Sequence, residues 1–115
     1  MAVLLFANCS KNNRDNQPPV INLSSPSNHQ TFAVGDKVPI TATISDDDEL
    51  HEVHLYVKNK ATGIDILHVE EHPDTKTFNL SKTFAGQSGV TYKIQIEAND
   101  HSSNQAEVEI EISFN

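Results

Sequence analysis

Histidine and acidic side chains recur at alternate positions in the middle of this chain. His54, His68, Glu70 and His72 stand in two segments in which polar and apolar residues alternate. Because side chains alternate across a β-strand, each set would lie on one face of a sheet. Imidazole nitrogens and a carboxylate oxygen suit zinc or copper. The pattern therefore predicts a divalent metal site at His54, His68, Glu70 and His72.

This site depends on the loop that joins the two segments. Residues 59–63 read Asn-Lys-Ala-Thr-Gly, which predicts a hairpin loop with glycine in a left-handed conformation. A five-residue loop would place His54 opposite His68, and a three-residue loop (61–63) would place it opposite Glu70. A four-residue loop would shift the register by one and separate the ligands. The other interpretation is a solvated sheet face that carries histidines, because no compact motif such as HExxH is present.

A second candidate site lies in two acidic loops. Asp46 opens a run of four acidic residues after one predicted strand, and Asp100 follows another. In the two-sheet sandwich that the strand pattern predicts, these loops lie side by side, so Asp46, Asp48 and Asp100 would supply the oxygen ligands that Ca²⁺ takes. Aspartates also form turns by hydrogen-bonding their own backbone, without any ion. His51 and His101 flank the same end and would suit a transition metal instead.

Cys9 is the only cysteine, which excludes an internal disulfide. It follows an apolar segment and precedes a polar stretch, in the order of a bacterial lipoprotein signal. Residues 5–9, Leu-Phe-Ala-Asn-Cys, resemble a lipobox, whose cysteine is lipidated and becomes the first mature residue. We therefore expect a truncated signal segment at 1–8 and a lipidated Cys9 with a flexible tether at 9–19. The alternative is a frayed terminus with an incidental thiol.

The elements that must position these residues are strands. The expected strands cover 20–23, 38–44, 53–57, 64–70, 78–80, 90–98 and 106–114. Seven strands at this spacing predict an all-β fold, an antiparallel Ig-like β-sandwich formed by residues 20–115. Its core would contain Ile40, Val53, Leu55, Tyr92, Ile94, Ile96, Val108 and Ile110. Tyr92 would also hydrogen-bond back to the preceding turn, as in a tyrosine corner.

Two groups of residues resemble bacterial Ig-like domains. The first runs from Pro18 to Asp46 and reads PPVINLSSP, FxxGDxV and AxISD; the second runs from Tyr92 to Asn104 and reads YxIxIxAxD followed by SxN. The resemblance implies the fold and says little about function, because such domains serve as spacers, adhesins and ligand binders. With its lipobox and the segment LHEVHL at 50–55, the chain also resembles a family of small bacterial lipoproteins of unknown function.

Composition excludes several classes of function. The formal net charge of −8 argues against nucleic-acid binding, which needs a positive surface, but permits cation binding. No apolar run after Cys9 approaches the ~20 residues of a membrane span. The chain carries no Gly-x-Ser-x-Gly elbow and no phosphate-binding glycine loop, so we do not expect an enzyme.

Together these features predict a lipid-anchored, non-catalytic Ig-like binding module of the bacterial cell envelope. Its partners would be the membrane, through the lipid, and a protein or an envelope surface; no cofactor would be required. The alternative is an envelope metal-binding protein that holds zinc or copper at the histidine cluster or calcium at the acidic loops. The sequence leaves both the periplasmic and the surface side of the membrane open.

Overall fold

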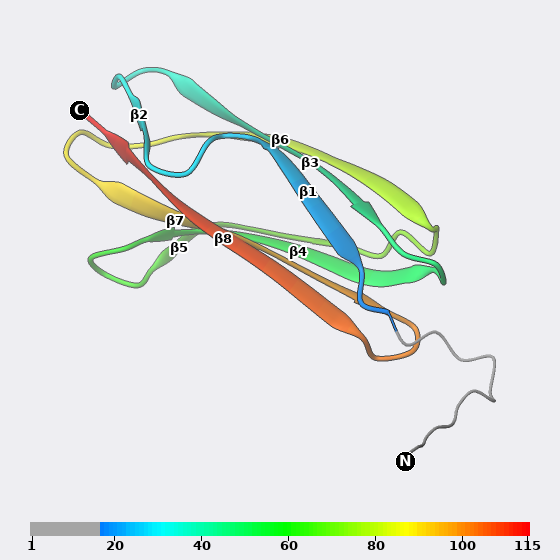
Figure 1. The fold of residues 1–115 in the computed structure, drawn as a ribbon. Helices are drawn as coiled ribbons and strands as arrows, with labels where there is room; N and C mark the ends of the chain where they lie inside the picture. The colour runs from blue at the N-terminus through cyan, green and yellow to red at the C-terminus, as the bar shows by residue number, and fades with distance from the viewer. Residues whose placement is uncertain (1–16) are drawn as a thin grey trace, which may run out of the picture.

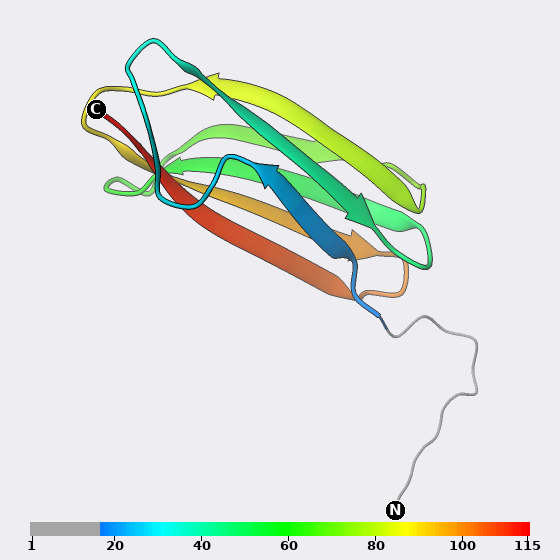
Figure 2. The ribbon, with the colours of Figure 1, turned by 45° about the horizontal axis from the view of Figure 1, so that its top comes forward.

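A computed structural model describes residues 17–115, which form two β-sheets packed face to face (Figures 1 and 2). The predicted lipidation site, Cys9, lies outside these residues. The strands of the described part are β1 (Val20–Ser25), β2 (Gln30–Phe32), β3 (Lys37–Ser45), β4 (Leu50–Asn59), β5 (Asp65–Glu71), β6 (Thr77–Ala85), β7 (Thr91–Asp100) and β8 (Gln105–Phe114). Within residues 17–115 there is no helix of the length and hydropathy that crossing a membrane requires.

The two sheets have the strand orders β1-β3-β6 and β2-β8-β7-β4-β5. Figure 2 shows the three-stranded sheet lying over the larger one. The predicted all-β, Ig-like sandwich is thus confirmed. Strand β2 was not predicted, because its three residues are too few to display an alternation. It pairs in parallel with residues 112–114 of β8, whereas the other strand pairs are antiparallel.

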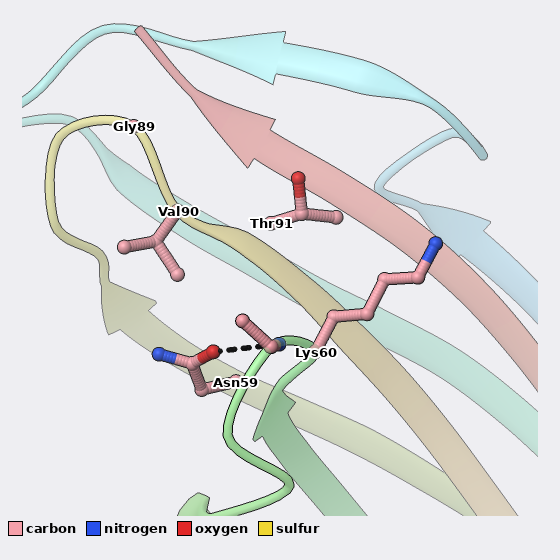
Figure 3. Close-up of a pocket in the computed structure, with 6 residues that line it drawn as sticks. Asn59, Lys60, Gly89, Val90 and Thr91 are labelled. Carbon is pink, nitrogen blue, oxygen red and sulfur yellow. Dashed lines mark hydrogen bonds between the residues drawn. The ribbon is translucent and has the colours of Figure 1, made fainter.

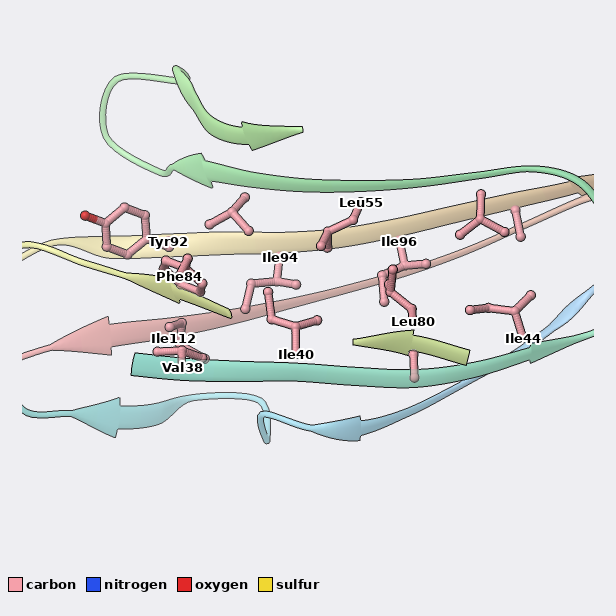
Figure 4. Close-up of a cluster of buried hydrophobic side chains, with 14 of the residues drawn as sticks. Val38, Ile40, Ile44, Leu55, Leu80, Phe84, Tyr92, Ile94, Ile96 and Ile112 are labelled. Carbon is pink, nitrogen blue, oxygen red and sulfur yellow. The ribbon is translucent and has the colours of Figure 1, made fainter. Parts of the chain in front are cut away.

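The core lies between the sheets and is built by strict alternation. In β3 and β7 every second side chain is buried, and Figure 4 shows these side chains meeting from the two sheets. Of the predicted core, Val108 and Ile110 are partly buried and pack against the other six residues, which are buried: Ile40, Val53, Leu55, Tyr92, Ile94 and Ile96. Burying one such aliphatic side chain contributes about 1.5–3 kcal/mol, so this layer holds the two sheets together without a disulfide.

Tyr92 closes one end of this core. Its Oη accepts a hydrogen bond of 3.0 Å from the backbone N–H of Gln87, in the turn before β7, which confirms the predicted tyrosine corner. The Tyr92 ring packs edge to face against Phe84 and Phe114, with centroids 5.5 and 5.8 Å away. Gly86 passes so close to these rings that a β-carbon there would lie 2.6 Å from Tyr92 Cε2 and nearer still to the Phe114 ring. Only a residue without a side chain fits at this corner.

The strand register identifies the two ends of the sandwich. Strand β4 runs from Leu50, beside Asp100, to Asn59, beside Tyr92. The β3–β4 and β7–β8 loops therefore share the end opposite the aromatic corner, and we call it the acidic end (loop residues 46–49 and 101–104). Strand β1 begins at the acidic end, because Val20 pairs with Ser45.

Candidate metal centre

The hairpin of β4 and β5 places His54 opposite Glu70, as predicted for a three-residue loop. The loop, however, has four residues, and a β-bulge in β5 corrects the register. The Asn59 N–H donates to the Ile64 carbonyl at 2.9 Å, and these two residues close a four-residue loop. Such a loop alone would have moved the ligands to opposite faces. The register then shifts beyond Lys58, which leaves Ile66 as an extra residue in β5. This β-bulge restores the shared face, so the expected loop lengths were wrong while the expected facing is confirmed.

A second bulge lies at the start of β4. Leu50 pairs with Asp100 and Glu52 pairs with Asn99, so His51 is an extra residue in the ladder. Leu50 and Val53 are both buried, and the two residues between them turn away from the core. Bulges re-aim side chains in this way and are over-represented beside functional sites. His51 and Glu52 consequently join His54 on the outer surface.

The structure brings His54, His68 and Glu70 together on that surface. His54 Nδ1 lies 3.2 Å from His68 Nε2 and 4.0 Å from Glu70 Oε1. One ligand atom of each residue lies within 4.8 Å of the others. With Zn–N bonds of about 2.0–2.1 Å, two nitrogens of a tetrahedral zinc site stand about 3.3 Å apart. The two imidazoles, which are hydrogen-bonded to each other, already have this separation, and a small rotation of Glu70 would complete three ligands.

Glu52 orients His54 and was not predicted as part of the site. Its Oε1 lies 3.1 Å from His54 Nε2, so a ring that donates Nε2–H to Glu52 turns the Nδ1 lone pair toward His68 and Glu70. Metal-ligating histidines are commonly held by a carboxylate in this manner. The hydrogen bond from His54 lowers the pKa of Glu52, the nearby charges of His51 and His72 add to this, and burial opposes it. Since Glu52 stands two residues before His54, strand alternation alone would have found it.

Tyr56 forms one wall of the cluster. Its ring stacks on His68, with centroids 4.5 Å apart and planes 12° apart, and its Oη lies 3.5 Å from His54 Nδ1. Burial raises the pKa of the Tyr56 phenol, and the charge of Glu97 adds to the effect. The phenol is therefore neutral at physiological pH. Stacking restricts the orientation of the His68 imidazole, which favours a fixed ligand geometry.

His72, the fourth predicted ligand, lies beside the cluster rather than in it. Its Nε2 is 2.8 Å from Glu70 Oε2, and it groups with Glu70 and Glu52. Glu70 thus stands between His72 and the pair of His54 and His68. Three of the four predicted residues share one potential coordination centre, and the fourth holds one of these three through an ion pair.

The three aspartates predicted as calcium ligands lie at the acidic end, where the two loops adjoin as expected. Ser102 Oγ donates to Asp48 Oδ2 at 3.2 Å across the loops. Asp100 Oδ1 accepts the backbone N–H groups of Ser102 and Asn104, both at 2.9 Å, and Asp46 Oδ2 accepts the N–H of Asp48 at 3.0 Å. Aspartates make these bonds when they stabilise turns. Calcium binding by Asp46, Asp48 and Asp100 stays a prediction.

A hollow lies at the end of the sandwich opposite the acidic end, and it is separate from both the histidine cluster and the three aspartates (Figure 3). It measures about 450 Å³ and is lined by Asn59, Lys60, Ala61, Gly89, Val90 and Thr91. Asn59 Oδ1 accepts the N–H of Ala61 at 2.9 Å, and Lys60 Nζ is paired with Glu111 at 3.0 Å. These groups serve the β4–β5 loop, and the lining carries neither a histidine nor a carboxylate. The cluster of His54, His68 and Glu70 lies instead on the outer face of the larger sheet.

Comparison with known proteins identifies the fold family. A family model described as a bacterial Ig domain matches residues 19–110. The match begins just before β1 and ends within β8, so it spans both sheets. A search of curated proteins found no match.

Proposed function

Because the chain belongs to the bacterial Ig domain family, we propose that it is a non-catalytic binding module of the cell envelope whose ligand is a divalent transition metal ion. His54, His68 and Glu70 bind the ion on the outer face of the five-stranded sheet. The observation that carries this function is the 3.2 Å separation of His54 Nδ1 and His68 Nε2, with Glu52 holding the far side of the His54 ring. Two imidazoles and one carboxylate are a ligand set for zinc or copper, with a fourth position left to solvent.

Titration of zinc into protein purified without a histidine tag tests this function. We expect wild type to bind zinc, and the His54→Ala/His68→Ala variant to lose the ion held on the sheet face. His29→Asn is the matched control, because His29 lies outside the cluster, in a left-handed conformation (φ 68°) that asparagine tolerates. Equal zinc binding by wild type and the double variant would refute the site. A calcium titration in parallel tests the acidic loops.

A protein or envelope surface is the second candidate partner, and one observation favours it. Glu97 on β7 stands directly opposite Glu107 on β8, on the outer face of the same sheet. Like charges in directly opposed positions destabilise a sheet, although Glu97 also accepts a hydrogen bond from Gln95 at 3.0 Å. A basic surface on a partner would neutralise it. The Glu97→Gln/Glu107→Gln variant should then be more stable than wild type and should bind a basic peptide more weakly. Higher stability with unchanged peptide binding would contradict this role.

Attachment to a membrane through lipidated Cys9 completes the proposal. Acylation of a cysteine anchors a chain without a membrane-spanning segment, in agreement with the family's association with the envelope. Expressed in a bacterial host behind a complete lipoprotein signal peptide, the wild-type protein should incorporate labelled fatty acid and fractionate with membranes. Cys9→Ser should abolish both, whereas the neighbouring Ser10→Ala should change neither. Membrane fractionation of Cys9→Ser would contradict the anchor.

A further inference from the structure

A second group of ligands gathers at the acidic end, apart from the His54 cluster. His51, Asp74 and His101 each place one ligand atom within 4.8 Å of the others. They come from three separate parts of the chain: the bulge in β4, the β5–β6 loop and the β7–β8 loop. None of them is a ligand of the site on the sheet face. Two loops and one strand position therefore converge at this cluster.

The distances within this group match those of a coordination centre. His101 Nε2 lies 3.1 Å from Asp74 Oδ1, close to the separation of about 3.3 Å between two ligands of a tetrahedral zinc ion. The rings of His51 and His101 have centroids 4.7 Å apart and are tilted by 48°. The Asp74 side chain is 61 % exposed and that of His101 is 43 % exposed. An ion pair so exposed contributes only about 0–1 kcal/mol, so it gives little reason for the three to converge.

Backbone hydrogen bonds hold the two loops against the start of β4. The Asp74 N–H donates to the Leu50 carbonyl at 3.0 Å, and the His101 N–H donates to the Glu49 carbonyl at 3.4 Å. Both loops are thereby fastened to the start of β4, next to His51. Asp74 also has a φ of 53°, a left-handed conformation that aspartate and asparagine adopt more readily than most residues. The ligands are therefore positioned by main-chain contacts that persist when the side chains rearrange around an ion.

We propose that His51, Asp74 and His101 bind a second divalent transition metal ion, with zinc or copper as the fitting class. The three ligands leave a fourth position for solvent or an exogenous ligand. Glu52 lies between the two centres: its Oε1 is 3.1 Å from His54 Nε2 and its Oε2 is 3.7 Å from His51 Nε2. One carboxylate therefore faces a histidine of each site. This second site does not depend on the first, because the two share no ligand.

Zinc stoichiometry, measured by native mass spectrometry and calorimetry on tag-free protein, tests the proposal. We expect two zinc ions per wild-type chain, one in His54→Ala/His68→Ala and one in His51→Ala/His101→Ala. The His29→Asn control should retain two. Asp74→Asn keeps the side-chain shape and the left-handed backbone while it weakens a ligand, so it guards against misfolding of the alanine variants. This variant should bind one zinc ion more than about 10-fold more weakly and the other with unchanged affinity. Loss of a group that only orients a ligand already has an effect of this size.

The outcomes separate the two sites. One zinc in wild type that disappears in His54→Ala/His68→Ala would uphold the sheet-face site and overturn the second one. One zinc that survives in that variant and disappears in His51→Ala/His101→Ala would uphold the second site and overturn the first. Two ions that survive in His51→Ala/His101→Ala, or an Asp74→Asn variant indistinguishable from wild type, would also overturn the second site.

Discussion

His54 and His68 meet diagonally across the β4–β5 hairpin, with Nδ1 and Nε2 3.2 Å apart. The residues directly opposite them are Glu70 and Tyr56, respectively. Diagonal neighbours in a sheet are about 7–8 Å apart at the backbone, within reach of two rings that lean toward each other. Each histidine therefore has its own directly opposed neighbour. His54 faces the carboxylate of Glu70, and His68 faces the ring of Tyr56. The diagonal pair is thus the centre of the proposed metal site on the sheet face.

Glu52→Gln should weaken zinc binding at the sheet face by about 10–100-fold, the usual effect of losing a carboxylate that orients a ligating histidine. Glutamine retains the shape of Glu52 but loses the charge that faces His54. Glu109→Gln is the matched control, because Glu109 pairs with Lys93 on the same face, away from the histidines. Competition with a zinc-binding dye measures the affinities. Equal weakening in both variants would reveal a general charge effect rather than an orienting role.

Acidification should release zinc before it unfolds the protein. Imidazole must be neutral to ligate a metal, so protons compete with zinc for the ring nitrogens as the pH falls. Calorimetric titrations at pH 7.5 and 5.5, with circular dichroism to monitor folding, should give a much weaker affinity at the lower pH. Binding unchanged at pH 5.5 would point to carboxylate ligands, such as Asp46, Asp48 and Asp100, instead of the histidines.

Ile94→Ala should lower the free energy of unfolding by about 2–5 kcal/mol, because it leaves a cavity between the sheets. Ile94 is 1 % exposed in β7. Thr83→Ala, an exposed position on β6, is the control and should change stability by less than about 0.5 kcal/mol. Urea unfolding measures both. A loss well below 1 kcal/mol at Ile94 would be inconsistent with a tightly packed core.

Glu111 should contribute to stability at neutral pH and not in acid. The hydrogen bond from Lys60, at 3.1 Å, holds the pKa of Glu111 below its ordinary value of 4.5. A carboxyl with a lower pKa in the folded state stabilises the fold above its unfolded pKa, and this contribution disappears as the pH falls through the folded pKa. Glu111→Gln should therefore be less stable than wild type at pH 7 and indistinguishable from it in strong acid.

Urea unfolding at both pH values checks this difference. Glu107→Gln is the control, because it removes an equal charge that faces Glu97 instead of a lysine. It should not reproduce the loss of stability at pH 7. A deficit in Glu111→Gln that persists undiminished in acid would show that packing, and not charge, is responsible.

The sequence predicts those features of the fold that follow from the alternation of apolar and polar residues along a strand. The buried positions of β3 and β7, and those of β4 from Val53 onward, repeat every second residue, so the sandwich and its core follow from the pattern. The shared outward face of His54, His68 and Glu70 follows in the same way. Strand β2 is too short for a pattern, and Asp74 reaches its place through a loop whose path only tertiary contacts fix. The bulges at His51 and Ile66 depend on how neighbouring strands pair, which a single strand's residues do not encode.

Each bulge adds one residue to its strand, and this affects how related sequences should be aligned. An in-frame deletion of Ile66 would remove only the extra residue, because Asp65 and Leu67 already stand opposite the consecutive residues Lys58 and Val57. His54 would keep Glu70 opposite it, and the ladder would lose its bulge. A relative can therefore lack this residue and still present the same ligands on one face, whereas a residue lost between His68 and Glu70 would turn one of these two side chains to the other face. Alignments of relatives should be read for gaps at positions 51 and 66 before the histidines are compared.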